Sequence, residues 1–512
     1  MSQAGPAPLR GGVLALTAFA LALGTFMQVL DSTIANVSLP TIAGNLGVSA
    51  DSGTWIVTSF AVANGVAVPL TGWLMGRFGV VRTFVASVLL FTLASFLCGI
   101  AWSLSSLIAF RILQGAVSGP MIPGSQALLI SIFPESKRTT ALGVWSMTTL
   151  IAPIAGPILG GYISDNFHWG WIFLINVPVG LFCAFVCWRV MAKRETPTRK
   201  LPIDTIGVAM LIVWVGALQI MLDLGKNADW FQSPTIVIAA LIAGIGFLAW
   251  LIWELTDAHP AVDLRLFKNR NFMLGTIAFC LGYAVFFANV LILPLWLQTQ
   301  MGYTATWAGL VAAPSGAVAV VLTPLVARFS GKLDARLLAT ISFAAFTVSY
   351  FMRAGYTTNA GFWDLTMPLL VNGVAMSTFF VSMLTIQLNG IPPEQIPSAT
   401  GISNFARITC GSFGASLITT AWDRREAVHQ SQLADHLTIF SPIYHNAAEI
   451  LTGLGASDLQ AAGAITRQMV QQAYLLAAND LFWISAWLSL AMIPLIWFAR
   501  RTYGGGGAVA AD

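Results

Sequence analysis

Long apolar segments recur along the whole chain, and short polar stretches separate them. A window of about 20 apolar residues is long enough to cross the roughly 30 Å hydrocarbon core of a bilayer as a helix. Fourteen such windows predict an all-α polytopic membrane protein with 14 transmembrane helices. The expected spans are 13–38, 54–75, 83–103, 105–131, 139–163, 169–190, 206–223, 235–253, 272–298, 304–327, 335–355, 363–388, 398–420 and 482–499.

The composition agrees with this architecture, because 57% of the 512 residues are hydrophobic and 9% are charged. Soluble domains carry roughly 25% charged residues. The net charge of +4 reflects loops on two sides of a bilayer and gives no reason to expect a nucleic-acid partner. The sequence has no phosphate-binding loop of the Gly-x-x-x-x-Gly-Lys-Ser/Thr type, and its five histidines lack a metal-binding spacing. We therefore expect no ATP hydrolysis, no metal and no cofactor.

The distribution of lysine and arginine predicts the orientation, since short cytoplasmic loops retain these residues. With the amino terminus inside, 18 of the 25 lysines and arginines fall in cytoplasmic segments. An even number of spans then places both termini in the cytoplasm.

The spans group into two six-helix halves, separated by two extra linking helices. Two halves around a midplane site are a common plan of transporters. The long segment 421–480 is expected on the outer face, and its part 457–480 has the spacing of an amphipathic helix. It is either a cap on the outer ends of the bundle or a docking surface for a periplasmic partner. The expected divisions are a cytoplasmic amino terminus (1–12), an N-terminal half (13–190), a basic cytoplasmic linker (191–205), two extra helices and their linker (206–271), a C-terminal half that includes 421–480 (272–503) and a flexible tail (504–512).

Asp31 is the only carboxylate deep inside an expected span. An acid there costs about 2.5 to 3.5 kcal/mol on insertion scales, which favours a functional role. A rise of about 1.5 Å per residue places Asp31 about 12 Å, and Arg111 about 10 Å, below the same outer boundary. We expect these charges to face one another, with Gln114 one turn from Arg111 holding the guanidinium. The alternatives are a pair that switches with protonation and a static buried ion pair.

Three further motifs contain small, proline or basic residues. Gly115 and Gly119 form a small-xxx-small pair that lets another helix approach. In the fifth span, proline removes backbone donors and glycine permits close contact, which predicts a kinked helix; a simple packing seam is the alternative. These residues are Pro153, Gly156, Pro157, Gly160 and Gly161. The turn after the second span contains Gly72, Arg77, Gly79 and Arg82, which alone indicate only cytoplasmic charge.

The substrate chamber of a transporter is expected to be mostly apolar and aromatic with few polar groups. Arg407 lies about 14 Å from the inner boundary, where its charge can attract an anionic compound. The alternatives for Arg407 are a packing counter-charge or an arginine that extends toward the interface. The candidate substrate-binding residues are Phe26, Gln28, Asn36, Trp145, Phe286, Phe379, Asn404 and Arg407.

Three of these motifs carry a family resemblance. The segments 30–37, 111–119 and 156–161 resemble motifs of the fourteen-helix drug:proton antiporters of the major facilitator superfamily. Further stretches, 25–29, 219–223 and 302–309, resemble its multidrug exporters from Gram-negative bacteria. The family's turn after the second span usually carries an acid where this chain has Gly76, which puts a charge-locked gate there in doubt.

The resemblance implies the major facilitator fold and proton coupling by Asp31, Arg111 and Gln114. It also implies an antiporter motif in the fifth span and a gating turn after the second. The expected activity is efflux of hydrophobic toxic compounds, such as uncouplers and weakly acidic antibiotics, across the inner membrane, driven by the proton gradient. The implied partners are a periplasmic adaptor (EmrA-like) and an outer-membrane channel (TolC-like). The alternatives are an importer of the same fold and, with less support, a membrane-embedded enzyme.

Overall fold

The computed structural model describes residues 8–48, 50–134, 137–198, 202, 204–257, 260–438 and 440–503. These ranges fold into helices, which confirms the all-α architecture. The helices are α1 (Gly11–Asn45), α2 (Ala50–Gly53), α3 (Trp55–Ala67), α4 (Thr71–Phe78), α5 (Val80–Gly99), α6 (Leu104–Ser118), α7 (Met121–Ile132), α8 (Arg138–Asn166), α9 (Trp171–Leu174), α10 (Asn176–Met191), α11 (Thr205–Leu224), α12 (Pro234–Thr256), α13 (Arg270–Thr299), α14 (Ala305–Phe329), α15 (Ala335–Arg353), α16 (Phe362–Gln387), α17 (Ile396–His436), α18 (Pro442–Gly453) and α19 (Asp458–Trp497).

Each of the 14 expected spans coincides with one helix or with two consecutive helices. The second span is divided into α3 and α4, which are bent by 58° around Pro69, and the fourth into α6 and α7 at Pro120. Proline interrupts a helix because it lacks a backbone N–H and its ring clashes with the preceding turn. By length and apolarity, 10 helices of the described ranges can cross a membrane, or 11 if α3 and α4 form one span.

Polar residues in the short connections begin several of the helices. Ser103, Asn269 and Thr304 accept hydrogen bonds from the first-turn backbone N–H groups of α6, α13 and α14. Ser457 does the same for α19, together with Gln460. Such caps satisfy donors that have no partner within the helix.

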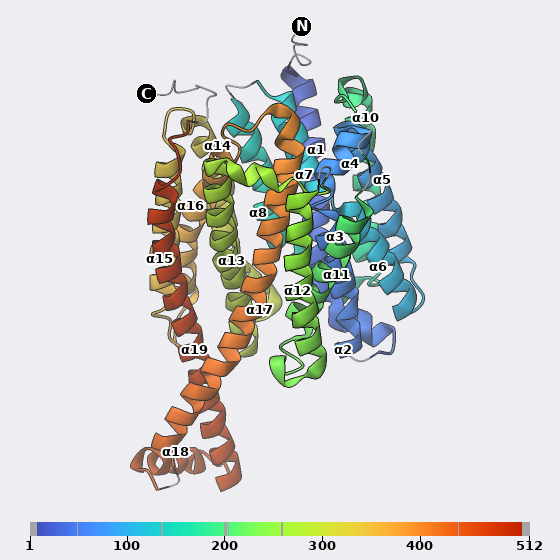
Figure 1. Ribbon diagram of the computed structural model, residues 1–512. Helices are drawn as coiled ribbons and strands as arrows, with labels where there is room; N and C mark the ends of the chain where they lie inside the picture. The colour runs from blue at the N-terminus through green and yellow to red at the C-terminus, as the bar shows by residue number, and fades with distance from the viewer. Residues whose placement is uncertain are drawn as a thin grey trace.

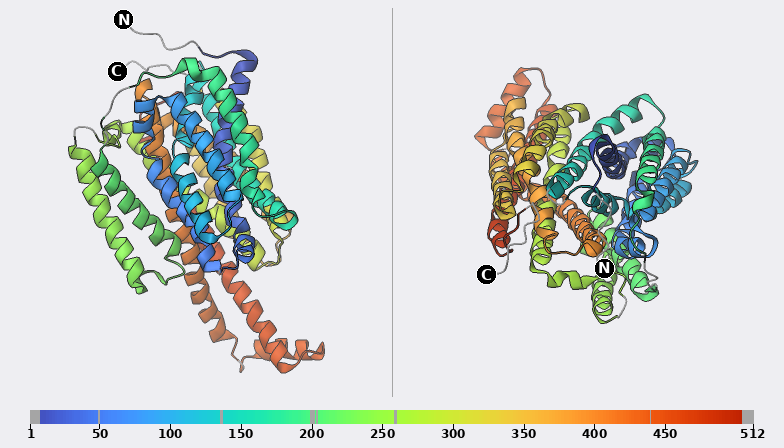
Figure 2. Two further views of the ribbon diagram at one scale, coloured as in Figure 1. Left: turned by 90° about the vertical axis from the view of Figure 1, so that its right-hand side faces the viewer. Right: turned by 90° about the horizontal axis from the view of Figure 1, so that it is seen from above.

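The helices form two groups with the extra pair beside them (Figures 1 and 2). The N-terminal group comprises α1–α10, and the C-terminal group comprises α13–α19. The groups meet where α7 packs on α17 and α8 packs on α14. Helix α11 packs on both α3 and α17, whereas only 22% of the α12 span is buried. The extra pair therefore covers one side of the contact between the halves, with α12 at the periphery.

The segment 421–480, expected as an outer loop, is largely helical. Helix α17 continues for 41 residues and α19 for 40, so both extend past the bundle, and α18 joins them at the tip (Figure 1). The helix expected over 457–480 is the first part of α19. The segment projects away from the bundle, so the interpretation as a cap was wrong. The first turn of α1 and the last turn of α19 both lie at the opposite end of the bundle, on different sides of it (Figure 1).

Candidate functional site

Asp31 on α1 and Arg111 on α6 are in direct contact inside the N-terminal half. The Arg111 Nη1 atom lies 2.6 Å from Asp31 Oδ2, and neither side chain is exposed. The two charges that sequence arithmetic placed at one depth therefore face one another. Because both groups are removed from water, their interaction depends on geometry and on the remaining hydrogen bonds.

Three side chains donate hydrogen bonds to the Asp31 carboxylate. Besides Arg111, Gln114 Nε2 donates to Asp31 Oδ1 at 3.0 Å, and Asn176 Nδ2 donates to the same oxygen at 2.9 Å. Gln114 also accepts from Arg111 Nη1 at 2.7 Å and donates to Ser95 Oγ at 2.7 Å. Asn176 and Ser95 were not among the candidates from sequence. The signal for Asn176 was a lone amide at the start of the apolar segment that forms α10.

Arg111 is also held by groups other than Asp31. Its Nε donates to the Ile56 carbonyl at 3.0 Å, and its guanidinium carbon lies 4.2 Å from the centre of the Phe60 ring. Phe173 contributes a second ring at 5.5 Å. These contacts of Arg111 do not depend on the charge of Asp31. Neutralising Asp31 would therefore leave a buried cation without its counter-charge, which strongly favours a rearrangement.

Helix α8 packs against α1 directly beside Asp31. A Cβ atom added to Gly156 would overlap the Thr33 side chain, and one added to Gly160 would lie 2.9 Å from Ile34 Cγ1. Around Gly161 nothing lies within 4 Å, so this third glycine is not part of the contact. Two of the three glycines, Gly156 and Gly160, therefore form the close contact between α8 and α1. Helix α8 is continuous from Arg138 to Asn166. Of the two prolines of the motif, Pro153 is half-buried, and the side chain of Pro157 lies outside the described part.

The turn after the second span joins α4 to α5, and at α4 the N-terminal half packs closely on the C-terminal half. A Cβ atom on Gly72 would overlap Ser398 of α17, so only glycine allows this approach of α4 to the C-terminal half. Gly79 has φ +93°, a conformation that glycine adopts without strain. Arg77 stacks on Trp73, with its guanidinium carbon 5.5 Å from the ring centre. Arg82, in the first turn of α5, is exposed.

A carboxylate from the distant linker caps α5 at this turn. Glu195 Oε1 accepts from the Val81 N–H at 3.0 Å, and Oε2 accepts from the Arg82 N–H at 2.8 Å. Thr196 Oγ1 accepts from the Val80 N–H at 3.1 Å. The sequence analysis found no acid in the turn itself, where Gly76 stands. The folded chain does bring an acid to this turn, but that acid, Glu195, lies more than 110 positions later in the sequence.

The matching turn in the C-terminal half has its acid in sequence. Asp334 accepts from the Arg336 N–H at 3.0 Å, and its Oδ2 atom lies 2.7 Å from Arg336 Nη2. Burial raises the pKa of Asp334, but the hydrogen bonds and charge of Arg336 outweigh burial and hold it below its ordinary value. Both halves therefore place a carboxylate at the start of the helix after the turn, by different routes.

Arg407 of α17 lies among polar and aromatic groups at the contact between the halves. Its Nη2 donates to Asn404 Oδ1 at 3.0 Å, and Asn404 Nδ2 donates to Gln126 Oε1 of α7 at 2.9 Å. The guanidinium carbon lies 4.5 Å from the Tyr283 ring centre and 5.8 Å from that of Phe279. Arg407 is 3% exposed, and no carboxylate in the described ranges pairs with it.

The other substrate-site candidates are placed unevenly. Tyr283 and Phe279, which sequence reasoning missed, contact Arg407. The candidates Phe286 and Phe379 instead contact these two rings, with ring centres 5.9 Å apart for Phe286 and Tyr283 and 5.4 Å apart for Phe379 and Phe279. The remaining candidates are distributed over α1 and α8: Gln28 and Trp145 are buried, Phe26 is half-buried, and Asn36 is exposed. Within the described residues, no group of three or more His, Cys, Asp or Glu side chains could hold a metal ion.

Comparisons with known proteins identify the family. The Major Facilitator Superfamily model matches residues 21–415. The chain is 48% identical over 502 residues to the multidrug export protein EmrB of Escherichia coli (strain K12), covering 98% of each chain. It is 45% identical over 502 residues to the fatty acid resistance protein FarB of Neisseria gonorrhoeae, covering 98% of this chain and 99% of that protein. The structure of the proton:xylose symporter XylE shares the fold, with a TM-score of 0.59 and 15% identity over 96% of this chain and 97% of that chain. The chain therefore belongs to the Major Facilitator Superfamily and is a multi-pass membrane transporter rather than an enzyme.

Proposed function

We propose that this transporter exports lipophilic toxic compounds in exchange for protons. The observation that carries the proposal is Asp31, a fully buried acid that accepts hydrogen bonds from Arg111, Gln114 and Asn176. Ionisable groups within membrane spans commonly mark proton pathways. The names of the relatives, a multidrug export protein and a fatty acid resistance protein, support export of lipophilic compounds as the activity.

The contacts of Asp31 suggest how a proton changes the protein. Protonation removes the negative charge that faces Arg111, and breaking a buried pair by losing one charge costs about 3 to 5 kcal/mol. Movement of α1 relieves this cost. Because Gly156 and Gly160 of α8 pack on the turn that follows Asp31, that movement is passed to α8. Helix α8 in turn packs on α14 of the other half.

We assign recognition of weakly acidic substrates to Arg407. Its buried guanidinium has no carboxylate partner in the described ranges and lies against the Tyr283 ring. An ionised drug would supply the missing negative charge, and the rings would contact its apolar body. Arg407→Gln should therefore reduce efflux of lipophilic acids more than efflux of lipophilic cations. Equal loss for both classes would contradict this assignment.

Transport in inverted membrane vesicles tests the proposal. Asp31→Asn keeps the size of the side chain and one acceptor oxygen but has no charge to gain or lose, so proton-driven drug accumulation should fall to background. Asp223→Asn, an acid at the end of α11, serves as the matched control and should retain accumulation. Asp31→Asn vesicles that still concentrate drug on imposing a proton gradient would refute the coupling. Drug movement in the opposite direction in the unmodified protein would indicate an importer.

We also propose an inner-membrane location with cytoplasmic termini, supported by the lysine and arginine distribution. The projecting segment 421–480 then lies in the periplasm and docks the adaptor, which passes substrate to the outer-membrane channel. Its tip exposes several large apolar side chains, and exposed apolar patches commonly mark protein interaction sites. These are Phe440, Ile443, Ile450, Leu454 and Leu459.

Copurification with the adaptor tests this docking. Ile443→Ser combined with Ile450→Ser should release the adaptor while leaving transport in vesicles intact. Leu417→Ser, an exposed position on α17 below the projection, is the control and should retain the adaptor. Unchanged copurification of the double variant would exclude the tip as the docking surface.

A further inference from the structure

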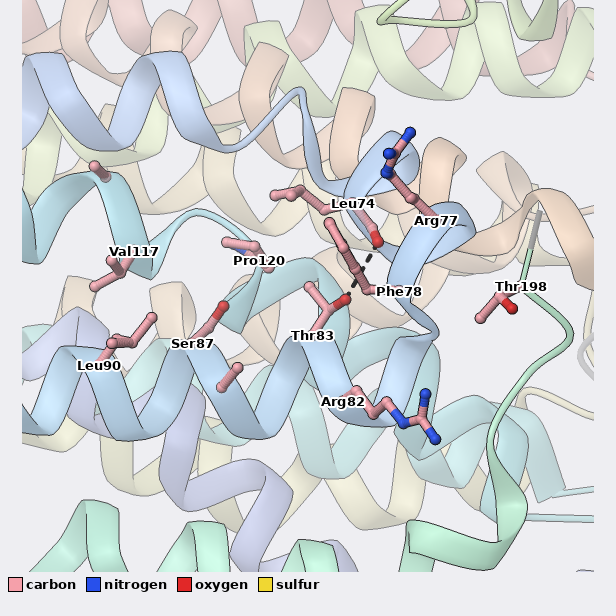
Figure 3. A pocket seen from close by; sticks show the side chains of 12 residues that line it. Leu74, Arg77, Phe78, Arg82, Thr83, Ser87, Leu90, Val117, Pro120 and Thr198 are labelled. Atoms are coloured by element: carbon pink, nitrogen blue, oxygen red, sulfur yellow. Dashed lines mark hydrogen bonds between the residues drawn. The ribbon is translucent and has the colours of Figure 1, made fainter. Parts of the chain in front are cut away.

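Arg353 is a buried arginine for which the described residues offer no negative charge. An arginine at a helix end commonly extends its charged group into water. Arg82, at the edge of the apolar pocket beside α5, is exposed in this way (Figure 3). Arg353 belongs to the last turn of α15, but only 2% of its surface is exposed. Because arginine keeps its proton in proteins, Arg353 is a cation enclosed in the C-terminal half.

The guanidinium of Arg353 lies against two aromatic rings. Its carbon atom is 5.3 Å from the centre of the Tyr350 ring and 5.8 Å from the centre of the Phe482 ring on α19. Both rings are fully buried. Side chains of a helix tilt toward its amino end, so Arg353 extends from the last turn of α15 back into the bundle, over Tyr350.

No hydrogen bond or ion pair among the described residues involves this guanidinium, and its Nε atom is enclosed without a partner. The ionisable groups that face Arg353 in the described ranges are the hydroxyl groups of Tyr350 and Tyr356, which are neutral near pH 7. Attraction to the ring faces offsets only part of the cost of removing a cation from water. An anion from solution would offset the rest.

The acids on the neighbouring elements are already engaged. Asp480 of α19 accepts a hydrogen bond from Arg425 Nε at 2.8 Å, and the same carboxylate oxygen lies 2.8 Å from His429 Nε2. Asp364, in the first turn of α16, accepts from the backbone N–H three residues before it at 2.9 Å. Neither acid is therefore free to neutralise Arg353.

The same cluster of rings contains a second donor without a partner. Trp296 of α13 stacks on Tyr356, with ring centres 5.8 Å apart, and its indole Nε1 is enclosed with no acceptor in the described part of the chain. Tyr356 in turn contacts Phe482, with ring centres 5.9 Å apart. The rings of Trp296, Tyr350 and Phe482 are fully buried. The cluster therefore suits a small acceptor and leaves no room for the apolar body of a drug.

We propose that Arg353 binds a small monovalent inorganic anion such as chloride. The anion accepts hydrogen bonds from the guanidinium and neutralises its charge. At about 1.5 Å per residue, Arg353 lies about 27 Å along α15 from Ala335, close to the end of the span. Asn479, at the base of the projecting part of α19, donates to the Tyr356 carbonyl at 2.9 Å. The anion therefore enters from the end of the bundle where the segment 421–480 projects.

Thermal unfolding of the purified full-length protein tests the site. At constant ionic strength, chloride should raise the unfolding midpoint of the wild type above its value in gluconate, which is too large to reach the enclosed guanidinium. A ligand at roughly ten times its Kd shifts the folding equilibrium about 11-fold toward the folded state. Arg353→Met supplies an uncharged side chain and should abolish the difference between the two salts. Arg328→Gln, which removes an exposed arginine in the last turn of α14, is the matched control and should retain the difference.

Bromide provides a second test that needs no variant. It resembles chloride chemically and scatters X-rays anomalously, so wild-type crystals grown in bromide should show a peak at hydrogen-bonding distance from the Arg353 guanidinium. Equal midpoints of the wild type in chloride and gluconate would mean that water and the rings suffice, and would overturn the proposal. A chloride effect that persists in Arg353→Met, or the lack of a bromide peak at Arg353, would do the same. Displacement of the bromide by a transported lipophilic acid would assign the site to substrate and would also overturn it.

Discussion

The cap that the linker places on α5 leads to a sharp prediction. Glu195→Ala removes the acceptors of the Val81 and Arg82 N–H groups, which have no partner within the helix. Each hydrogen bond to a charged group contributes about 1.5 to 3 kcal/mol when buried. Glu195 is only half-buried, and water can replace part of the interaction. The loss of an N-cap typically costs about 0.5 to 2 kcal/mol, so we expect about 2 kcal/mol for two bonds.

Hydrogen exchange of the amides at the start of α5 measures this loss. A local destabilisation of about 2 kcal/mol should speed the exchange of the Val81 and Arg82 amides roughly 30-fold. Glu195→Gln keeps one acceptor and loses the charge, so its effect should fall between those of wild type and Glu195→Ala. Glu449→Ala on α18 removes an equally charged but exposed side chain and should leave these amides unchanged.

Unaltered exchange at Val81 and Arg82 in Glu195→Ala would refute the reasoning. It would mean that water satisfies these amides as well as the carboxylate does. The same variant should also loosen the linker, because the contact joins residues more than 110 positions apart.

Two further predictions concern the contact of α8 with α1 and the turn before α15. Gly156→Ala should destabilise the protein by about 1 to 3 kcal/mol because the new methyl overlaps Thr33, whereas Gly161→Ala, in open space, should be near neutral in thermal unfolding. The lowered pKa of Asp334 means that its ionised form stabilises the folded state above its ordinary value of 3.8 and that this contribution is lost as the pH falls through the lowered pKa. The stability difference between wild type and Asp334→Asn, at most about 1 kcal/mol, should therefore be present at pH 6 and disappear in acid; a difference that grows in acid would contradict this sign.

The sequence alone was informative about everything that depends on position along a helix. A fixed rise per residue converts residue counts into depth, which is why Asp31 and Arg111 could be paired from their residue numbers. The positions of the apolar windows likewise predicted which segments become helices. Pro69 and Pro120 were visible in the sequence as well, but the breaks that they cause in the second and fourth spans were not predicted.

Tertiary structure decided which helix faces meet and what polar groups do between them. Asn176 reaches Asp31 because α10 packs beside α1, and Ser95 joins through Gln114 and Asn176 because α5 packs on α6 and α10. Periodicity does not specify a helix's neighbours. Glu195 reaches α5 through a linker whose sequence reads only as basic and polar. The direction of the segment 421–480 was also undetermined, because a polar amphipathic pattern fits a helix lying on the bundle and one projecting from it equally well. Depth follows from local geometry, whereas contacts between distant segments follow from packing.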